Sequence, residues 1–205
     1  MTGLRDAKRA AVARRLARIA FERVREHGIG EVTVEDIVTE AEVSRRTFSN
    51  YYACKEAAVA AVVMHSVEAA LEEWDAPDTL DVLALARHLV DHQLRSGALT
   101  LLTEVAALAA EHPQLVPFVR DAQWQVWSAV GDKVLHAVPT PDSDDAETVR
   151  LVVGALFGIV SAALASTGPR DGDPSRLLHA SVLRGLARLE GGLGQPDQES
   201  RPSFD

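Results

Sequence analysis

The sequence predicts an all-α protein, with a small N-terminal domain of three helices that includes a helix-turn-helix and a larger helical domain after it. Three observations support this prediction. Apolar residues recur at helical spacing along most of the 205 residues, alternating runs of β-branched residues that favour strands do not persist, and two short helical periods flank one tight corner within residues 33–55. We refer to residues 1–55 as the head and to residues 56–191 as the body.

The first helix is expected from about Leu4 to His27, because apolar residues gather on one face and Gly28 follows at the usual C-terminal position. Its other face carries the basic residues Lys8, Arg9 and Arg15. These side chains either attract a DNA backbone or only form a solvated helix face. For any single residue the sequence supports both interpretations equally.

The second helix is predicted from an apolar period that begins at Val34 and ends at Ala41. Thr33 is its expected N-cap. Asp36 stands three residues later, where a carboxylate can accept from the free backbone donors of the first turn and favour the positive helix end. The two residues together therefore predict where this helix starts.

A second apolar period, from Val43 to Tyr52, predicts a short third helix with Ser44 as its N-cap. Helices this short are marginal in isolation, so both must pack on a neighbour through their apolar stripes. The opposite face of the third helix is then left outward. It carries side chains that can pair with base edges and phosphates in a major groove, namely Arg45, Arg46, Ser49 and Asn50.

The run TVEDIVTEAEVSRRTFSNYYACKEAAV, from Thr33 to Val59, resembles the DNA-binding domain of the TetR (tetracycline-repressor-like) transcriptional regulators. Close resemblance covers about the first quarter of the chain, and the remainder is similar only in general layout. The family pattern is matched in order and spacing at Thr33, Ile37, Ala41, Val43, Ser44, Thr47, Phe48, Tyr51, Lys55 and Glu56.

This resemblance implies a homodimer that binds a palindromic double-stranded DNA operator and responds to a small-molecule effector. It implies phosphate contacts from Thr33, Ser49, Tyr51 and Lys55, and contacts to base edges or their neighbours from Arg45, Arg46, Thr47 and Asn50. Ser44 is expected on the same DNA-binding face, and Phe48 and Tyr52 are expected to support the core.

Three positions depart from the family pattern. Glu42 replaces the usual turn glycine, so a left-handed backbone there would store strain of about 1 kcal/mol. Ser49 replaces a common aromatic residue, which removes one usual backbone contact. Tyr52 replaces the usual Phe, and its hydroxyl needs water or a protein partner.

Helical patterns continue through the body, divided by Gly- and Pro-containing breaks, and the tail Gly192–Asp205 is expected to be disordered from its Gly, Pro, Gln, Ser and Asp content. The first body helix should connect the head to the rest of the body. The helices are expected at Lys55–Trp74, Leu80–Ser96, Leu99–Glu111, Gln114–Ala137, Ala146–Thr167 and Ser175–Gly191.

The last two predicted helices are apolar on more than one face, which would leave an exposed apolar patch on a monomer. We therefore expect them to pair with their copies in a symmetric four-helix contact, as the resemblance also implies. Deep burial within a single chain is the alternative. Residues Leu151–Thr167 contain no charge but suit close helix packing better than membrane insertion, so no membrane partner is expected.

Candidate effector-binding residues are the bulky aromatic side chains of the body and polar side chains that could face inward. Ordinary core packing is the alternative for the aromatics, and a surface position is the alternative for the polar residues. The ligand-binding candidates are His65, His92, Glu104, Phe118, Trp124 and Trp127.

Catalytic residues, metal ligands and cofactors are not expected. His88 and His92 have the spacing of a two-histidine metal clamp, but Leu89 stands where the metalloprotease version has Glu, which favours a structural pair. The chain has neither a glycine-rich phosphate loop nor a G-x-S-x-G nucleophile motif.

Charge is distributed unevenly. The net charge is −9, yet the head has 11 Lys or Arg against 8 Asp or Glu and is formally +3, which leaves −12 on the other 150 residues. This asymmetry is typical of a basic DNA-contacting domain on an acidic body. The single cysteine, Cys54, excludes an internal disulfide and favours a reducing, cytoplasmic location.

The sequence therefore predicts a sequence-specific DNA-binding transcriptional regulator, expected to be a repressor released by a small molecule. An all-helical carrier of lipophilic ligands, or an enzyme with a non-functional basic head, is the alternative. Sequence alone does not separate a repressor from an activator, and it leaves the operator and the effector open.

Overall fold

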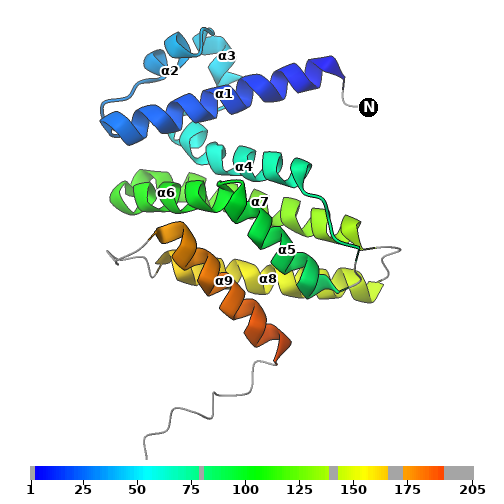
Figure 1. Cartoon of the computed structure of the whole chain (residues 1–205). Coiled ribbons are helices and arrows are strands. Elements are labelled where there is room, and N and C mark those ends of the chain that lie inside the picture. Colours follow the sequence, from blue (N-terminus) through cyan, green and yellow to red (C-terminus); the bar gives the residue numbers. More distant parts are fainter. Residues whose placement is uncertain (1–2, 79–80, 139–142, 166–172, 192–205) are drawn as a thin grey trace, which may run out of the picture.

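The computed structural model describes residues 3–78, 81–138, 143–165 and 173–191, and over these residues it contains helices and no strand (Figure 1). The all-α prediction is confirmed. The helices are α1 (Leu4–His27), α2 (Val34–Glu40), α3 (Arg45–Ser49), α4 (Lys55–Glu73), α5 (Val82–Arg95), α6 (Ala98–Glu111), α7 (Val116–Ala137), α8 (Ser143–Ala165) and α9 (Pro174–Glu190), with a 3₁₀ turn at Pro113–Leu115.

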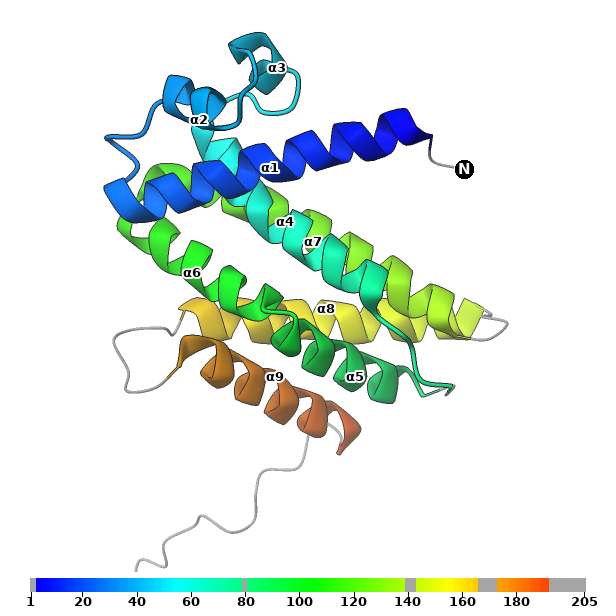
Figure 2. The same ribbon diagram turned by 45° about the horizontal axis from the view of Figure 1, so that its top comes forward.

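The head is built on the long helix α1, against which the short helix α2 packs, and α3 packs in turn against α2 (Figure 2). Leu16 and Val24 on α1, Ile37 on α2 and Phe48 on α3 are almost completely buried. Full burial of one such side chain stabilises the folded state by about 1.5–3 kcal/mol. This shared core explains how helices of seven and five residues remain folded.

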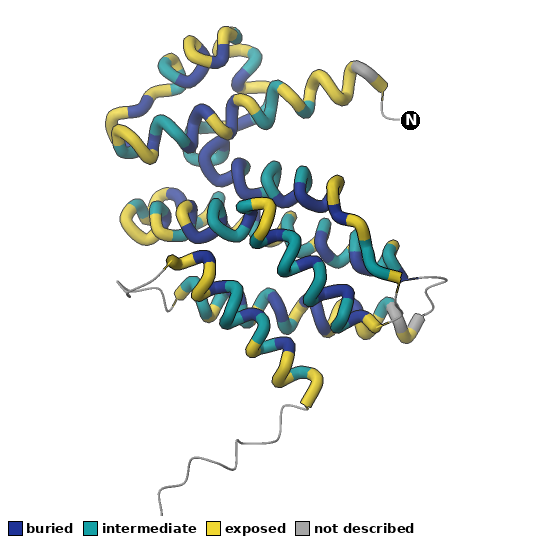
Figure 3. The backbone as a smooth tube through the Cα atoms, viewed as in Figure 1, coloured by how far each residue is buried: buried dark blue, intermediate teal, exposed yellow. Residues whose placement is uncertain are grey.

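Helix α4 lies between the head and the rest of the body. It packs against α1 on one side and against α6 and α7 on the other, and buried residues recur along it from Ala58 to Leu71 (Figure 3). At its C-terminal end, Nε1 of Trp74 donates to Nδ1 of His88 over 2.9 Å, which ties the end of α4 to α5. A displacement of α4 would therefore change its packing against α1, α5 and α7 together.

Helices α8 and α9 pack on each other and on α5, and their inner faces are buried within this chain, including Val152, Leu156 and Val182. Part of the apolar surface that suggested a dimer contact is thus internal core. Two large apolar side chains nonetheless remain outward, with Leu151 67% and Leu177 39% exposed.

Helix boundaries differ from the predictions by a few residues, for local reasons. Helix α5 starts at Val82 because the Asp81 carboxylate accepts from the backbone N–H groups of Leu83 and Ala84 and so caps it. Helix α8 starts at Ser143, three residues before the expected start. The predicted end of that helix at Thr167 and the predicted disordered tail lie outside the described residues.

One stretch of α8, Ala146–Ala165, is by length and composition apolar enough to cross a membrane. A single helix of this kind is weak evidence for a membrane protein, because helices of soluble proteins pass the same test. Only about a quarter of this stretch is buried within the chain, so α8 carries apolar surface that its own chain leaves uncovered.

Candidate DNA-binding surface and effector cavity

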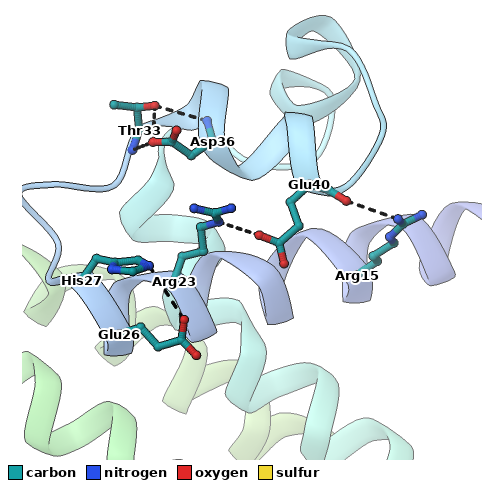
Figure 4. A network of polar contacts seen from close by, with 7 residues as sticks. All are labelled: Arg15, Arg23, Glu26, His27, Thr33, Asp36 and Glu40. Carbon is teal, nitrogen blue, oxygen red and sulfur yellow. Dashed lines mark hydrogen bonds and ion pairs between the residues drawn. The ribbon is translucent and has the colours of Figure 1, made fainter.

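The start of α2 is fixed by the predicted capping box (Figure 4). The Asp36 N–H donates to Oγ1 of Thr33 over 3.2 Å, and the Asp36 carboxylate accepts from the Thr33 N–H and hydroxyl at 2.8 and 2.7 Å. The Thr33 hydroxyl hydrogen bond lowers the pKa of the Asp36 carboxyl below its ordinary value. The cap thus stabilises the head above the unfolded pKa and is lost as the pH falls through the lowered folded value.

Two arginines of α1 hold the C-terminal end of α2 (Figure 4). Nε of Arg23 lies 2.5 Å from the Glu40 carboxylate, and a guanidinium nitrogen of Arg15 donates to the Glu40 carbonyl oxygen over 3.4 Å. Arginine can serve both kinds of acceptor because its guanidinium carries several donors. These two arginines therefore orient the helix-turn-helix on α1.

The corner between α2 and α3 contains a residue in the left-handed region, at the position where the family pattern has glycine. Glu42 has φ 51°, and the N–H of Val43 donates to the Val38 carbonyl oxygen over 3.0 Å to close the turn. An L-residue with a Cβ is strained in this region by about 1–2 kcal/mol, whereas glycine is not. Glu42 also places a carboxylate 4.0 Å from Arg15, on an exposed surface beside α3.

Replacing Glu42 with glycine is expected to raise the free energy of unfolding by about 0.5–1 kcal/mol, because relief of backbone strain exceeds the extra freedom of the unfolded chain. Denaturant unfolding of the whole chain measures this. Glu42→Ala is the matched control, since it removes the same charge and keeps the strained φ. Equal stability of the two variants would contradict the strain argument.

Helix α3 begins at Ser44, whose Oγ accepts from the Thr47 N–H over 3.0 Å. Phe48 points into the core. Of the predicted DNA-binding residues, five are exposed on or beside α3, Thr47 and Tyr51 are half-buried, and Thr33 is exposed with its hydroxyl engaged in the α2 cap. The exposed five are Ser44, Arg45, Arg46, Ser49 and Asn50.

Two predicted DNA contacts already have protein partners. Nη1 of Arg45 is paired with the Glu35 carboxylate from α2, so this guanidinium is held rather than freely mobile. Nζ of the half-buried Lys55 donates to the Ile29 and Val32 carbonyl oxygens at 2.5 and 2.7 Å. Lys55 thereby ties the start of α4 to the α1–α2 loop, which is a structural task that the family resemblance did not indicate.

The Tyr52 hydroxyl has protein hydrogen-bond partners, one of the two possibilities expected from the sequence. It donates to the Ala13 carbonyl oxygen of α1 over 2.9 Å and lies 2.8 Å from Nε2 of His65 on α4, while Nδ1 of His65 lies 3.2 Å from the Glu68 carboxylate. Burial raises the pKa of Tyr52 above its ordinary value, so the hydroxyl stays protonated. Tyr52 thus joins α1 to α4.

The Tyr52→Phe variant should lose about 0.5–1.5 kcal/mol of stability, because it removes this part-buried hydrogen-bond pair without changing the ring. Thermal and denaturant unfolding measure the loss. Tyr51→Phe is the matched control, since none of the three contacts above involves the Tyr51 hydroxyl. A similar loss in both variants would argue against a specific α1–α4 link.

An apolar cavity of about 70 Å³ lies inside the body, bounded by side chains from α4 to α9. Trp127 is the one predicted effector-binding residue that lines it, and its ring packs edge-on against Phe157 with centroids 5.3 Å apart. Gln93 also lines this cavity and is buried, with 6% of its surface exposed. Gln93 was not predicted from the sequence, although it continues the buried face of Leu85, Ala86 and Leu89 at helical spacing.

The other predicted effector-binding residues do not gather around this cavity. His65 and Phe118 line a separate cleft of about 340 Å³ between the head and α7. Trp124 is 72% exposed, and the exposed Glu104 lies 3.9 Å from Arg25 of α1. The six candidates are therefore dispersed over distinct places in the body.

The histidine pair on α5 has structural contacts. His88 accepts from Trp74, and Nε2 of His92 lies 2.8 Å from the Ala70 carbonyl oxygen, to which it donates. Both imidazoles thus fasten α5 to α4. Across the described residues, no three His, Cys, Asp or Glu side chains come together as a possible metal site.

Comparisons with known proteins agree with this arrangement. Residues 19–62 match the family model for bacterial regulatory proteins of the tetR family. The HTH-type transcriptional regulator UidR of Escherichia coli K12 is 22% identical over 192 residues, covering 87% of this chain and 91% of UidR. Two solved structures share the fold.

The Thermus thermophilus repressor FadR, solved in complex with lauroyl-CoA, has a TM-score of 0.50 and 22% identity, covering 93% of this chain and 100% of that one. The TetR-family regulator SCO0332 has a TM-score of 0.51 and 24% identity, covering 86% of this chain and 97% of that one. In its helix-turn-helix geometry, and in the match over residues 19–62, the chain is thus similar to bacterial transcriptional regulators of the TetR family.

Proposed function

We propose that this protein is a homodimeric, sequence-specific repressor in which α3 of each subunit enters the major groove of a palindromic operator. The observation that carries the proposal is the orientation of α3, which buries Phe48 and leaves Arg45, Arg46, Ser49 and Asn50 outward. Arginine forks suit guanine edges and phosphates, and asparagine suits adenine edges. The head, residues 1–55, would be the DNA-binding unit and residues 56–191 the effector-binding and dimerisation unit.

Roles within the interface follow from what each side chain already contacts. Arg46, Ser49 and Asn50 would read bases or phosphates directly, and Arg45 would exchange Glu35 for DNA. Ser44, Thr47 and Tyr51 would contribute near the backbone, while Thr33 and Lys55 would act mainly by holding α2 and α4 in place. The formal charge of +3 on the head and −12 elsewhere supports docking of the head alone.

The outward face of α8 and α9 supports the dimer. A groove of about 740 Å³ runs between these helices, lined by small and apolar side chains such as Ile159, Ala163 and Leu177 together with Arg184 and Arg188. A second copy of the same pair would cover this groove and the exposed Leu151 in a symmetric four-helix contact. That assembly would set the two α3 helices one helical turn of DNA apart, about 34 Å.

The cavity in the body supports regulation by a small molecule. A ligand can release DNA only if it binds one separation of the two heads better than the other. Because α4 lines the cavity through Val67 and also packs on α1, a ligand that displaces α4 would move the head. That FadR of the same fold was solved with lauroyl-CoA supports a body that receives a ligand.

Selection of bound sequences from random double-stranded DNA, followed by gel shift, tests the proposal. We expect a palindromic consensus, two chains per duplex, and an affinity that falls steeply with salt because phosphates are neutralised. A helical carrier or an enzyme with a merely structural head would select no consensus. Addition of the operator to a promoter fused to a reporter would distinguish a repressor from an activator.

The same proposal places the protein in the cytoplasm as a non-enzymatic regulator that uses neither a membrane nor a cofactor. The uncovered apolar face of α8 has two possible covers, a second copy or a lipid bilayer. Fractionation of cells that express the full chain separates them, since the dimer should remain in the soluble fraction. Recovery in the membrane fraction would contradict this part of the proposal.

A further inference from the structure

The body cavity contains one polar group that the protein itself does not satisfy. Both polar side-chain atoms of Gln93, Nε2 and Oε1, are buried and have no hydrogen-bond partner among the described residues. All other residues that line the cavity are apolar apart from the backbone, with Leu89, Trp127 and Val153 among them. An unpaired amide in such surroundings destabilises a fold, so its position calls for a physical reason.

From this geometry we infer that Gln93 is the polar anchor of the effector site, and that the effector is an uncharged, mostly apolar molecule with one carbonyl, hydroxyl or amide group. The inference rests on the proposed ligand response. A glutamine amide offers two donors and one acceptor oxygen, so it can satisfy any of these groups. Recognition sites of this type combine an apolar lining with a few convergent polar groups that fix orientation.

Charge is excluded by the lining. None of the side chains that line the cavity carries a formal charge, so an ionised ligand group would be buried without a counter-ion. Asp91 and His92 precede Gln93 in the sequence but face elsewhere, since the Asp91 carboxylate lies 2.6 Å from His179 of α9 and His92 donates to the carbonyl oxygen of Ala70 of α4. The neutral amide is therefore the group that can discriminate between ligands.

The position of Gln93 also connects recognition to regulation. Gln93 lies on α5, one residue from His92, which is bonded to the α4 backbone at Ala70. A ligand that pairs with the amide would act on α5 next to that link, and its apolar part would press on Val67 of α4. Both contacts are on the route from the cavity to α1 and the head.

The cavity volume of about 70 Å³ sets the size of the probe. An engineered apolar cavity of roughly 150 Å³ holds benzene, so this cavity must open to about twice its volume to take a single six-membered ring. Cyclohexanone, methylcyclohexane and cyclohexanecarboxylate form a matched set of similar size. Cyclohexanone carries an uncharged hydrogen-bond acceptor, methylcyclohexane carries no polar group, and cyclohexanecarboxylate carries a negative charge.

Calorimetric titration of the full-length protein with the three probes tests the inference. We expect cyclohexanone to bind at least about 10-fold more tightly than either of the others. One hydrogen bond to an otherwise unpaired amide should lower the dissociation constant by about 10-fold. Equal affinity for cyclohexanone and methylcyclohexane would overturn the anchor role. Absence of binding by all three up to their solubility limits would overturn the cavity as a ligand site.

The Gln93→Leu variant provides the matched control. It keeps the side-chain size and removes the amide, so it should melt at a higher temperature than the wild type and bind cyclohexanone and methylcyclohexane equally. A variant that keeps the preference for cyclohexanone, or that melts at a lower temperature, would contradict the inference. Gel shifts with the selected operator are measured separately. A probe that binds through Gln93 without releasing DNA would contradict the proposed ligand response, but it would support the role of Gln93 in ligand binding.

Discussion

The Arg46→Ala variant is expected to bind the operator about 5- to 150-fold more weakly per half-site, because one arginine–base pairing is worth about 1–3 kcal/mol. Arg46 is exposed on α3, and no carboxylate of the described residues pairs with it. Its guanidinium can therefore meet DNA without first leaving a protein partner. Gel shift or fluorescence anisotropy at fixed salt measures the change.

Arg120→Ala is the matched control, since it removes an exposed arginine of α7 that lies outside the proposed interface. It should leave the operator affinity nearly unchanged. Both variants should retain the wild-type dimer mass and thermal stability. An Arg46→Ala variant with normal operator affinity would show that this face of α3 is not the DNA-reading face.

Arg45 is expected to be less costly to replace than Arg46, because its guanidinium is already paired with Glu35. Binding DNA must exchange that exposed ion pair, worth about 0.2–1 kcal/mol, for a contact with a base or phosphate. Glu35 was not identified from the sequence. It stands ten residues before Arg45, and only the turn between α2 and α3 brings the two side chains together.

The head could be predicted closely because its signals are local. Thr33 and Ser44 start helices through hydrogen bonds to groups three residues away, and Glu42, which stands where the family pattern has glycine, takes the left-handed conformation in the corner between two apolar periods. Such rules depend on neighbouring residues rather than on distant packing. The family resemblance added roles that spacing alone does not give.

The effector site could not be predicted in the same way, because its residues come from six helices whose packing is long-range. Trp124 and Trp127 lie three residues apart on α7, yet Trp124 is 72% exposed while Trp127 lines the cavity. A helix that packs against neighbours on two sides has no single apolar face from which its buried positions can be predicted. Gln93 was overlooked because a buried polar residue is uncommon, although its spacing from Leu89 placed it on the inner face.

The second large effect is expected from Leu177→Glu, which should convert the dimer to a monomer at micromolar concentration. Leu177 lines the groove between α8 and α9 and is 39% exposed, so its own fold tolerates a polar replacement. In a symmetric contact the carboxylate would lose its hydration and displace apolar packing once in each subunit. Sedimentation equilibrium measures the loss of mass, and far-UV circular dichroism should remain unchanged.

Operator affinity should then fall by about 100- to 10,000-fold, because each head binds its half-site without the effective concentration that the partner head provides. Ala107→Glu places the same charge on an exposed position of α6 and should leave mass and DNA binding intact. The two largest effects are separable by the mass of the free protein. The Leu177→Glu variant should be a monomer that fills the two half-sites independently, whereas Arg46→Ala should remain a dimer that binds each half-site more weakly. A Leu177→Glu protein that remains a dimer would place the subunit contact on another face, such as the one around Trp124.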